Sequence, residues 1–173
     1  MGILDPIFAK PLAVRMIPNV DSEMAAALNL RREQCSIGLI TADNDDALYV
    51  SIDEATKMAD VEVVYAHSFY AGAKHSSGKL SGEIIAILAG QNPAEVRAGL
   101  NAAVDYMRNQ AVWYSANEDG SIAFFPHLIS RTGTYLSKVC NIPLGDPIAY
   151  LIAPPLQGMM ALDAALKASA ARI

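Results

Sequence analysis

The sequence predicts an α/β fold built from a duplicated unit, and three observations support this prediction. Runs rich in β-branched residues alternate with helix-forming segments along the chain. The order strand, short helix, strand, helix is expected in the first half and again in the second. One helix, at 92–109, has clear start signals. Since 53% of the 173 residues are hydrophobic and 18% are charged, the chain can bury a sizeable core.

The first half is expected to begin with a strand and a helix that Asp21 caps. Strands rich in Val, Ile and Tyr follow, and Asp53 is expected to cap a short helix between them. The expected strands are 12–20, 35–41, 47–52, 61–69 and 83–90, and the expected helices are 22–30 and 54–59.

The helix at 92–109 is the most clearly marked element. Asn92 supplies an N-cap, and Pro93 occupies the first helical position, where its missing N–H costs nothing. Its apolar positions recur at helical spacing on one stripe: Val96, Leu100, Ala103, Val104 and Met107.

The second half is expected to repeat this order, with strands at 121–130 and 147–153 and helices at 132–139 and 155–169. Aligning 46–50 with 146–151 gives the repeat a shift of about 100 residues. The second copy is shorter than the first and lacks a strand, a hairpin and a helix. We therefore expect a first domain at 1–110 and an incomplete second domain at 111–173.

Charge and composition exclude several classes of partner. The net charge is −5 and no basic stripe is present, so nucleic acid is not expected to bind. The N-terminus has no secretion signal, and no apolar run is long enough to cross a membrane, so a soluble cytoplasmic protein is expected. Cys35 and Cys140 are isolated in the sequence and are interpreted as buried thiols.

Motifs for catalysis, cofactors and metals are absent from the sequence. His67, His75 and His127 have neither metal-ligand spacing nor the neighbours of a nucleophile, and no phosphate-binding glycine pattern occurs. The acidic run beginning at Asp43 resembles a calcium loop but has Leu48 where such a loop needs glycine. We predict no catalytic residue, no cofactor and no metal.

Asp45, Glu83 and Trp113, which Tyr114 follows, are the candidates for ligand binding. Two carboxylates and an aromatic face suit a small ammonium ion, through charge-assisted hydrogen bonds and a cation–π contact. Spacing alone favours a plainer interpretation, in which these are a turn aspartate, a glutamate at a strand edge and a packed tryptophan.

Several segments resemble the EutL family, the L-type shell proteins of the ethanolamine-utilisation microcompartment, from about residue 12 to the end. These are GLITADNDDALY, VEVVYAHSFYAGA, NPAEVRAGL, SRTGTYLSK and LGDPIAYLIAPPL. The resemblance implies two tandem, circularly permuted bacterial-microcompartment domains of ferredoxin-like type, the second without its last strand and helix. It also implies a homotrimer that tiles with other shell proteins in a microcompartment of the cytoplasm, and no enzymatic activity.

The resemblance also implies site residues. Ethanolamine is expected to bind at Asp45, Asp46, Glu83 and Trp113, near a small pore through each subunit. A central pore is expected to be gated by the loop 71–82, through Ala71, Gly72, His75, Ser76, Ser77, Gly78 and Lys79. Two other classes remain as alternatives: an ethanolamine-binding regulatory module without a transport role, and an amine-handling enzyme, for which no general base was found.

Overall fold

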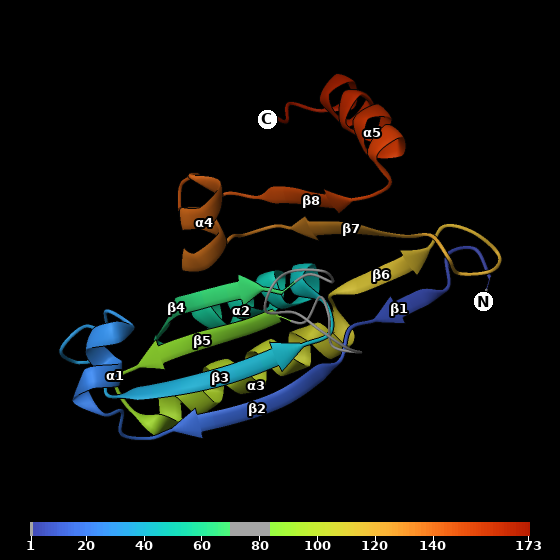
Figure 1. Ribbon diagram of the computed structural model, residues 1–173. Coiled ribbons are helices and arrows are strands. Elements are labelled where there is room, and N and C mark those ends of the chain that lie inside the picture. Colours follow the sequence, from blue (N-terminus) through green and yellow to red (C-terminus); the bar gives the residue numbers. More distant parts are fainter. Residues whose placement is uncertain (1, 70–83) are drawn as a thin grey trace.

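The computed structural model describes residues 2–69 and 84–173, and within these residues the strands form two four-stranded sheets (Figure 1). The first sheet has the order β2-β3-β5-β4, and each neighbouring pair is antiparallel. β3 and β5 are therefore the central strands and β4 is an edge. The bounds are β2 Pro11–Ile17, β3 Ser36–Ala42, β4 Val61–Ser68 and β5 Ile84–Gly90.

Helices α2 (Asp45–Met58) and α3 (Pro93–Asn109) cover one face of this sheet (Figure 1). The main core lies between them and the sheet, because apolar side chains of all these elements meet there. Its fully buried members include Ile40, Leu48, Ile52, Leu88, Val96 and Met107. The short helix α1 (Ser22–Ala27) lies at one end of the sheet, and a smaller cluster around Ile37 packs there.

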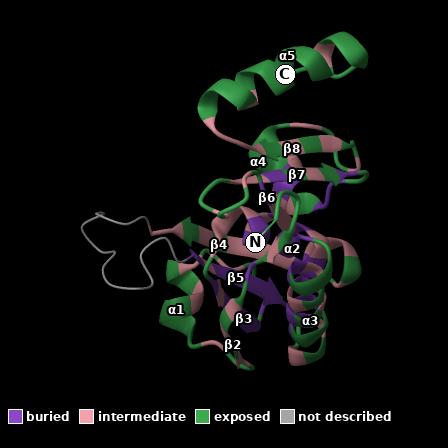
Figure 2. Cartoon of the chain, turned by 90° about the vertical axis from the view of Figure 1, so that its right-hand side faces the viewer, coloured by how far each residue is buried: buried purple, intermediate pink, exposed green. Residues whose placement is uncertain are grey.

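The second sheet has the order β1-β6-β7-β8, with antiparallel neighbours. Its first strand comes from the N-terminus, so the chain crosses between the sheets early. The bounds are β1 Pro6–Phe8, β6 Val112–Ser115, β7 Ala123–Ile129 and β8 Ile148–Ile152. Helix α4 (Thr134–Cys140) connects β7 to β8, and α5 (Pro155–Ala168), which has no buried residue, follows β8 (Figure 2).

The expectation of a strand at 47–52 is wrong, because these residues lie inside α2. The Asn44 side chain accepts a hydrogen bond from the Ala47 N–H at 2.8 Å. Two acidic residues occupy the first turn, where their negative charge interacts favourably with the helix dipole. Buried residues then recur with helical spacing, so tertiary packing outweighs the β propensity of Val50 and Ile52.

Asp53 does not cap a helix at 54–59, as the sequence suggested. It lies in the middle of α2, is fully buried, and accepts hydrogen bonds from the backbone N–H groups of Gly133 and Leu136 at 2.7 and 2.8 Å. These groups belong to the first turn of α4, where backbone donors lack partners within the helix. Asp53 therefore caps a helix 80 residues further along the chain.

The duplicated order is present, but the alignment proposed for it is wrong. Residues 46–50 lie in α2, whereas 148–151 lie in β8. The elements recur instead as β2-α1-β3-α2 and β7-α4-β8-α5, and the pairs β2·β3 and β7·β8 are both antiparallel. This order makes the β3–α2 turn equivalent to the β8–α5 turn. The domain limits 1–110 and 111–173 stay a prediction.

The remaining elements follow the expectations closely, with three exceptions. The helix expected to reach residue 30 ends at Ala27, and Asn29 then adopts a positive φ of 53°. The strands β1 and β6 were not expected. Both cysteines are exposed rather than buried. The best-marked helix is confirmed, since the Asn92 side chain accepts from Ala94 N and Glu95 N at 2.9 and 3.0 Å.

Candidate functional site

The candidate site lies at the N-terminus of α2, where the turn Asn44–Asp46 follows β3. Asn44 caps the helix, which places Asp45 and Asp46 in the first turn. The Asp45 carboxylate accepts the Asp46 backbone N–H at 3.0 Å. The Asn44 cap thus fixes the residue at which α2 begins, and with it the position of the two adjacent carboxylates in the first turn.

Three other elements contribute a side chain to this turn. Ser68, at the end of β4, donates its hydroxyl to Asp45 Oδ2 at 2.8 Å. Tyr150, on β8, donates its hydroxyl to Asp46 Oδ1 at 2.5 Å. Trp113, on β6, donates its indole N–H to Asn44 Oδ1 at 3.1 Å. Both halves of the chain therefore build the surroundings of the acidic pair.

An aromatic cluster supports these contacts. The Phe125 ring is fully buried and stacks on Trp113 on one side, with centroids 5.3 Å apart, and on His127, with centroids 5.0 Å apart. Tyr150 meets the Phe125 ring edge-on at 5.8 Å. Because Trp113 and Tyr150 contact the same buried ring, their polar groups are held in fixed relation to the turn.

The environment changes the acidity of two of these groups. Burial raises the pKa of Asp46; the hydrogen bond from Tyr150 opposes this shift, and the charge of Asp45 adds to it. The pKa of Tyr150 is raised, first by burial and then by its hydrogen bond to Asp46, so the phenol keeps its proton and remains a donor. The turn thus combines one half-buried acid with a permanent neutral donor.

A pocket of about 310 Å³ lies beside the turn. It is lined by Ile7, Phe8, Ala9, Asp43, Asn44, Trp113 and Ala123. Trp113 and Asn44, which are hydrogen-bonded to each other, thus line this pocket, and Asn44 directly precedes the two carboxylates in the sequence. A small polar ligand at Asp45 and Asp46 would have the Trp113 side chain as a neighbour.

The structure brings together the predicted residues Asp45, Asp46 and Trp113. The indole N–H of Trp113 binds Asn44 and not a carboxylate. Glu83 and the predicted gate residues Ala71, Gly72, His75, Ser76, Ser77, Gly78 and Lys79 lie outside the described residues. Ile84, which follows Glu83 in the sequence, pairs with Ala42 of β3 and Ser68 of β4.

Sequence reasoning missed Asn44, Ser68 and Tyr150. Asn44 carried a usable signal, because Asn followed by two acidic residues is typical of a helix start. Ser68 and Tyr150 carried none: Tyr150 is 104 positions from its partner Asp46, and only the fold brings the two together.

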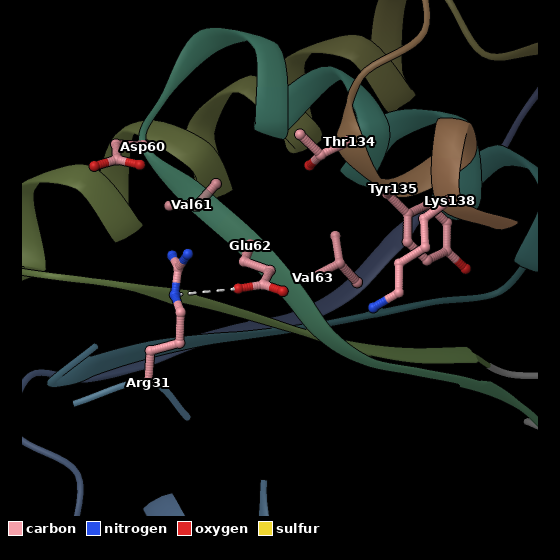
Figure 3. A pocket seen from close by; sticks show the side chains of 8 residues that line it. All are labelled: Arg31, Asp60, Val61, Glu62, Val63, Thr134, Tyr135 and Lys138. Carbon is pink, nitrogen blue, oxygen red and sulfur yellow. Dashed lines mark ion pairs between the residues drawn. The ribbon is translucent and has the colours of Figure 1, made fainter. Parts of the chain in front are cut away.

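A second pocket lies between β4 and α4 and contains charges of both signs (Figure 3). Arg31 Nε lies 3.7 Å from Glu62 Oε2, and Gln34 donates to the same oxygen at 3.0 Å. Lys138 approaches from α4 on the other side of Val63 (Figure 3). Because acidic and basic groups balance here, the pocket lacks the excess negative charge that an ammonium ligand needs.

The helix-covered antiparallel sheet and a match to the BMC domain model over residues 36–117 define the class: a protein with a bacterial-microcompartment domain. The EutL shell protein of Clostridium perfringens (strain 13 / Type A) is 55% identical over 165 residues, covering 95% of this chain and 76% of that protein. Its counterpart from Escherichia coli (strain K12) is 48% identical over 169 residues, covering 98% and 77%.

The crystal structure of the ethanolamine utilization protein EutL from Leptotrichia buccalis C-1013-b superimposes with a TM-score of 0.89 at 58% identity, covering 98% of this chain and 77% of that one. The chain therefore belongs to the EutL family of bacterial microcompartment shell proteins. This confirms the resemblance, the mixed α/β fold class and the structural, non-enzymatic role in the microcompartment shell. The comparisons support this role and not the alternative of a regulatory module.

No helix in residues 2–69 and 84–173 is long and apolar enough to cross a membrane.

Proposed function

We propose that the chain assembles as a homotrimer, tiles with other shell proteins, and carries pores for small polar metabolites. The duplicated order of elements supports this proposal, since two similar units repeated three times can close a ring of six. Electron microscopy of a concentrated sample tests it. Discs or sheets are expected from a tile, whereas isolated globules at every concentration would contradict tiling. The central-pore gate at 71–82 stays a prediction of the same proposal.

We further propose that Asp45, Asp46, Glu83 and Trp113 bind the ammonium group of ethanolamine. The observation that supports this most is the meeting of two carboxylates at one helix start beside the Trp113 indole. Ile84, which follows Glu83 in the sequence, pairs with Ser68 in the sheet, and the Ser68 hydroxyl donates a hydrogen bond to Asp45. A charge-assisted hydrogen bond contributes about 1.5–3 kcal/mol, so the carboxylates are expected to supply most of the affinity.

The expected binding is weak. Ligand efficiency limits a molecule of about four heavy atoms to roughly 6 kcal/mol, which corresponds to micromolar affinity at best. Weak binding suits passage through a pore, because a tightly held metabolite would not leave. Salt should weaken it further, since screening reduces the attraction between exposed charges.

Calorimetry with ethanolamine tests the site. Asp45→Asn, Asp46→Asn and Glu83→Gln should abolish the signal, and Trp113→Ala should reduce it. Asp163→Asn is the matched control, because Asp163 is an exposed carboxylate on α5 that pairs only with Lys167 among the described residues. If the carboxylate variants bind like the wild type, the plainer interpretation of a turn aspartate and a packed tryptophan holds.

The stoichiometry should be one ethanolamine per chain. The β8–α5 turn, equivalent by element order to the β3–α2 turn, has Pro154 at the N-cap position of Asn44. Pro155 and Leu156 follow where the first turn has Asp45 and Asp46. Within the described part of the chain, no side-chain hydrogen bond caps α5. The duplication has therefore kept the acidic pair in one copy only, and two ligands per chain would contradict the assignment.

A further inference from the structure

Tyr150 joins the acidic turn from the other half of the chain. It lies on β8, and its hydroxyl donates to Asp46 Oδ1 at 2.5 Å. Its ring packs edge-on against Phe125, which also stacks on Trp113. The ring contact fixes where the hydroxyl lies, so the direction of the hydrogen bond to Asp46 is set by the packing of the second sheet.

This contact leaves the two oxygens of Asp46 in different situations. Oδ1 is occupied by the Tyr150 hydroxyl, whereas Oδ2 accepts no hydrogen bond from any residue within the described ranges. A carboxylate with one oxygen held by a neutral donor loses rotational freedom, and its second oxygen can accept from a ligand. Within the described residues, Oδ2 thus keeps its capacity to accept a hydrogen bond.

We propose that Tyr150 is a positioning residue of the ammonium site: it orients Asp46 toward the ligand and makes the second half of the chain part of that site. This inference rests on the proposed binding of the ethanolamine ammonium group at Asp45 and Asp46. Tyr150 itself needs no contact with the ligand, because it acts through the carboxylate that it holds.

The protonation of Asp46 follows from the same geometry. Its titratable neighbours among the described residues are Asp45 on its own helix and Tyr150 from β8, and Tyr49 in turn faces Tyr150. Burial and the Asp45 charge favour the protonated acid, whereas the Tyr150 hydroxyl stabilises the carboxylate. Removing that hydroxyl should raise the pKa of Asp46 further, and the protonated acid binds a cation poorly.

Tyr150→Phe removes the hydroxyl and keeps the ring. Affinity for ethanolamine should fall roughly fivefold at pH 8, as expected for one lost orienting hydrogen bond. On acidification the wild type loses affinity as Asp46 becomes protonated, and Tyr150→Phe should lose it at a higher pH. A purely structural role would not move this pH dependence. Tyr106→Phe is the control, since the Tyr106 hydroxyl bonds His127 and not Asp46.

Two measurements separate the outcomes. The first is the carboxyl NMR titration of Asp46 without ligand. The second is the ethanolamine affinity between pH 4 and pH 8 of the wild type, Tyr150→Phe, Tyr106→Phe and Asp46→Asn. We expect Tyr150→Phe, but not Tyr106→Phe, to raise both the pKa of Asp46 and the pH at which binding fails. Asp46→Asn should abolish binding. Equal titration of Asp46 in the wild type and Tyr150→Phe overturns the positioning role alone. A wild type that binds no ethanolamine overturns the proposed function as well.

Discussion

The carboxylate of Asp53, in the middle of α2, accepts the backbone N–H of Leu136 in α4 at 2.8 Å. Its other oxygen accepts from Gly133 N at 2.7 Å, and Lys57 Nζ lies 3.8 Å from that oxygen. A fully buried acid of the first half thus satisfies the start of a helix in the second half. Together with Tyr150 and Asp46, this contact holds the two halves beside the candidate site.

Asp53→Asn should destabilise the protein by about 2–3 kcal/mol, because an amide can accept only one of the two N–H groups and places its own N–H₂ against the other. Urea unfolding measures the change. Asp163→Asn replaces an exposed carboxylate, and its free energy of unfolding should stay within about 0.5 kcal/mol of that of the wild type. Equal stability of the two variants would remove Asp53 as the link between the halves.

Gly133→Ala tests the same contact between α2 and α4 by steric crowding, whereas Asp53→Asn tests it by removing a charge. A Cβ atom at Gly133 would lie 2.3 Å from Thr56 Oγ1 and 2.5 Å from the Asp53 carbonyl oxygen, so α4 must move away from α2. We expect a loss of about 1–3 kcal/mol. Gly158→Ala in α5 is the contrast: its nearest neighbour would be 3.9 Å away, and Ala should stabilise this helix by about 0.5–1 kcal/mol. The same sign for both would contradict the prediction.

Stability should fall on mild acidification because of His127. The pKa of His127 is lowered, because burial penalises its charged form and the charge of Lys57 repels it. The unfolded chain therefore binds the proton more tightly, so the stabilisation present above the ordinary pKa of 6.5 is lost as the pH falls toward the lowered value.

Urea unfolding of the wild type and His127→Gln between pH 7.5 and pH 5.5 measures this effect. The difference between the two proteins isolates the contribution of His127 from that of the carboxyl groups, among them Asp46, whose pKa is raised by burial. His67→Gln serves as control, because His67 is exposed. An unchanged pH slope in His127→Gln would show that another group causes the loss.

Trp113 is the only tryptophan of the chain, so its fluorescence reports directly on the candidate site. Ethanolamine should change the emission in a saturable way, because an ammonium group next to the indole alters its electrostatic surroundings. Ethanol, which keeps the hydroxyl but lacks the amine, should leave the emission unchanged. A response of Asp46→Asn equal to that of the wild type would place the ligand elsewhere.

The sequence allowed accurate prediction where local chemistry decides the structure. Asn92 and Pro93 mark the start of α3, and the β-branched run before Phe69 marks β4. The sequence was misleading at 47–52, where residues of high β propensity lie in α2. This helix forms there because Asn44 caps its start and one of its faces is buried. Local signals compete there, and tertiary packing decides between them.

The site was predictable only in part. Asp45, Asp46 and Trp113 came from the resemblance and from the chemistry that an ammonium ion needs. In the structure Trp113 is hydrogen-bonded to Asn44, which directly precedes the two carboxylates, and their binding role stays a prediction. The Tyr150 and Asp53 contacts each join positions about 80 to 100 residues apart, so no pattern in the sequence could indicate them. Such contacts become visible only when both sheets are in place.

The mass of the particle in solution tests the central claim most directly. Light scattering should give three times the 18.4 kDa of one chain, as expected for a homotrimeric shell tile. The mass should stay constant on dilution through the micromolar range. A single species with the mass of one chain at every concentration would contradict the homotrimer.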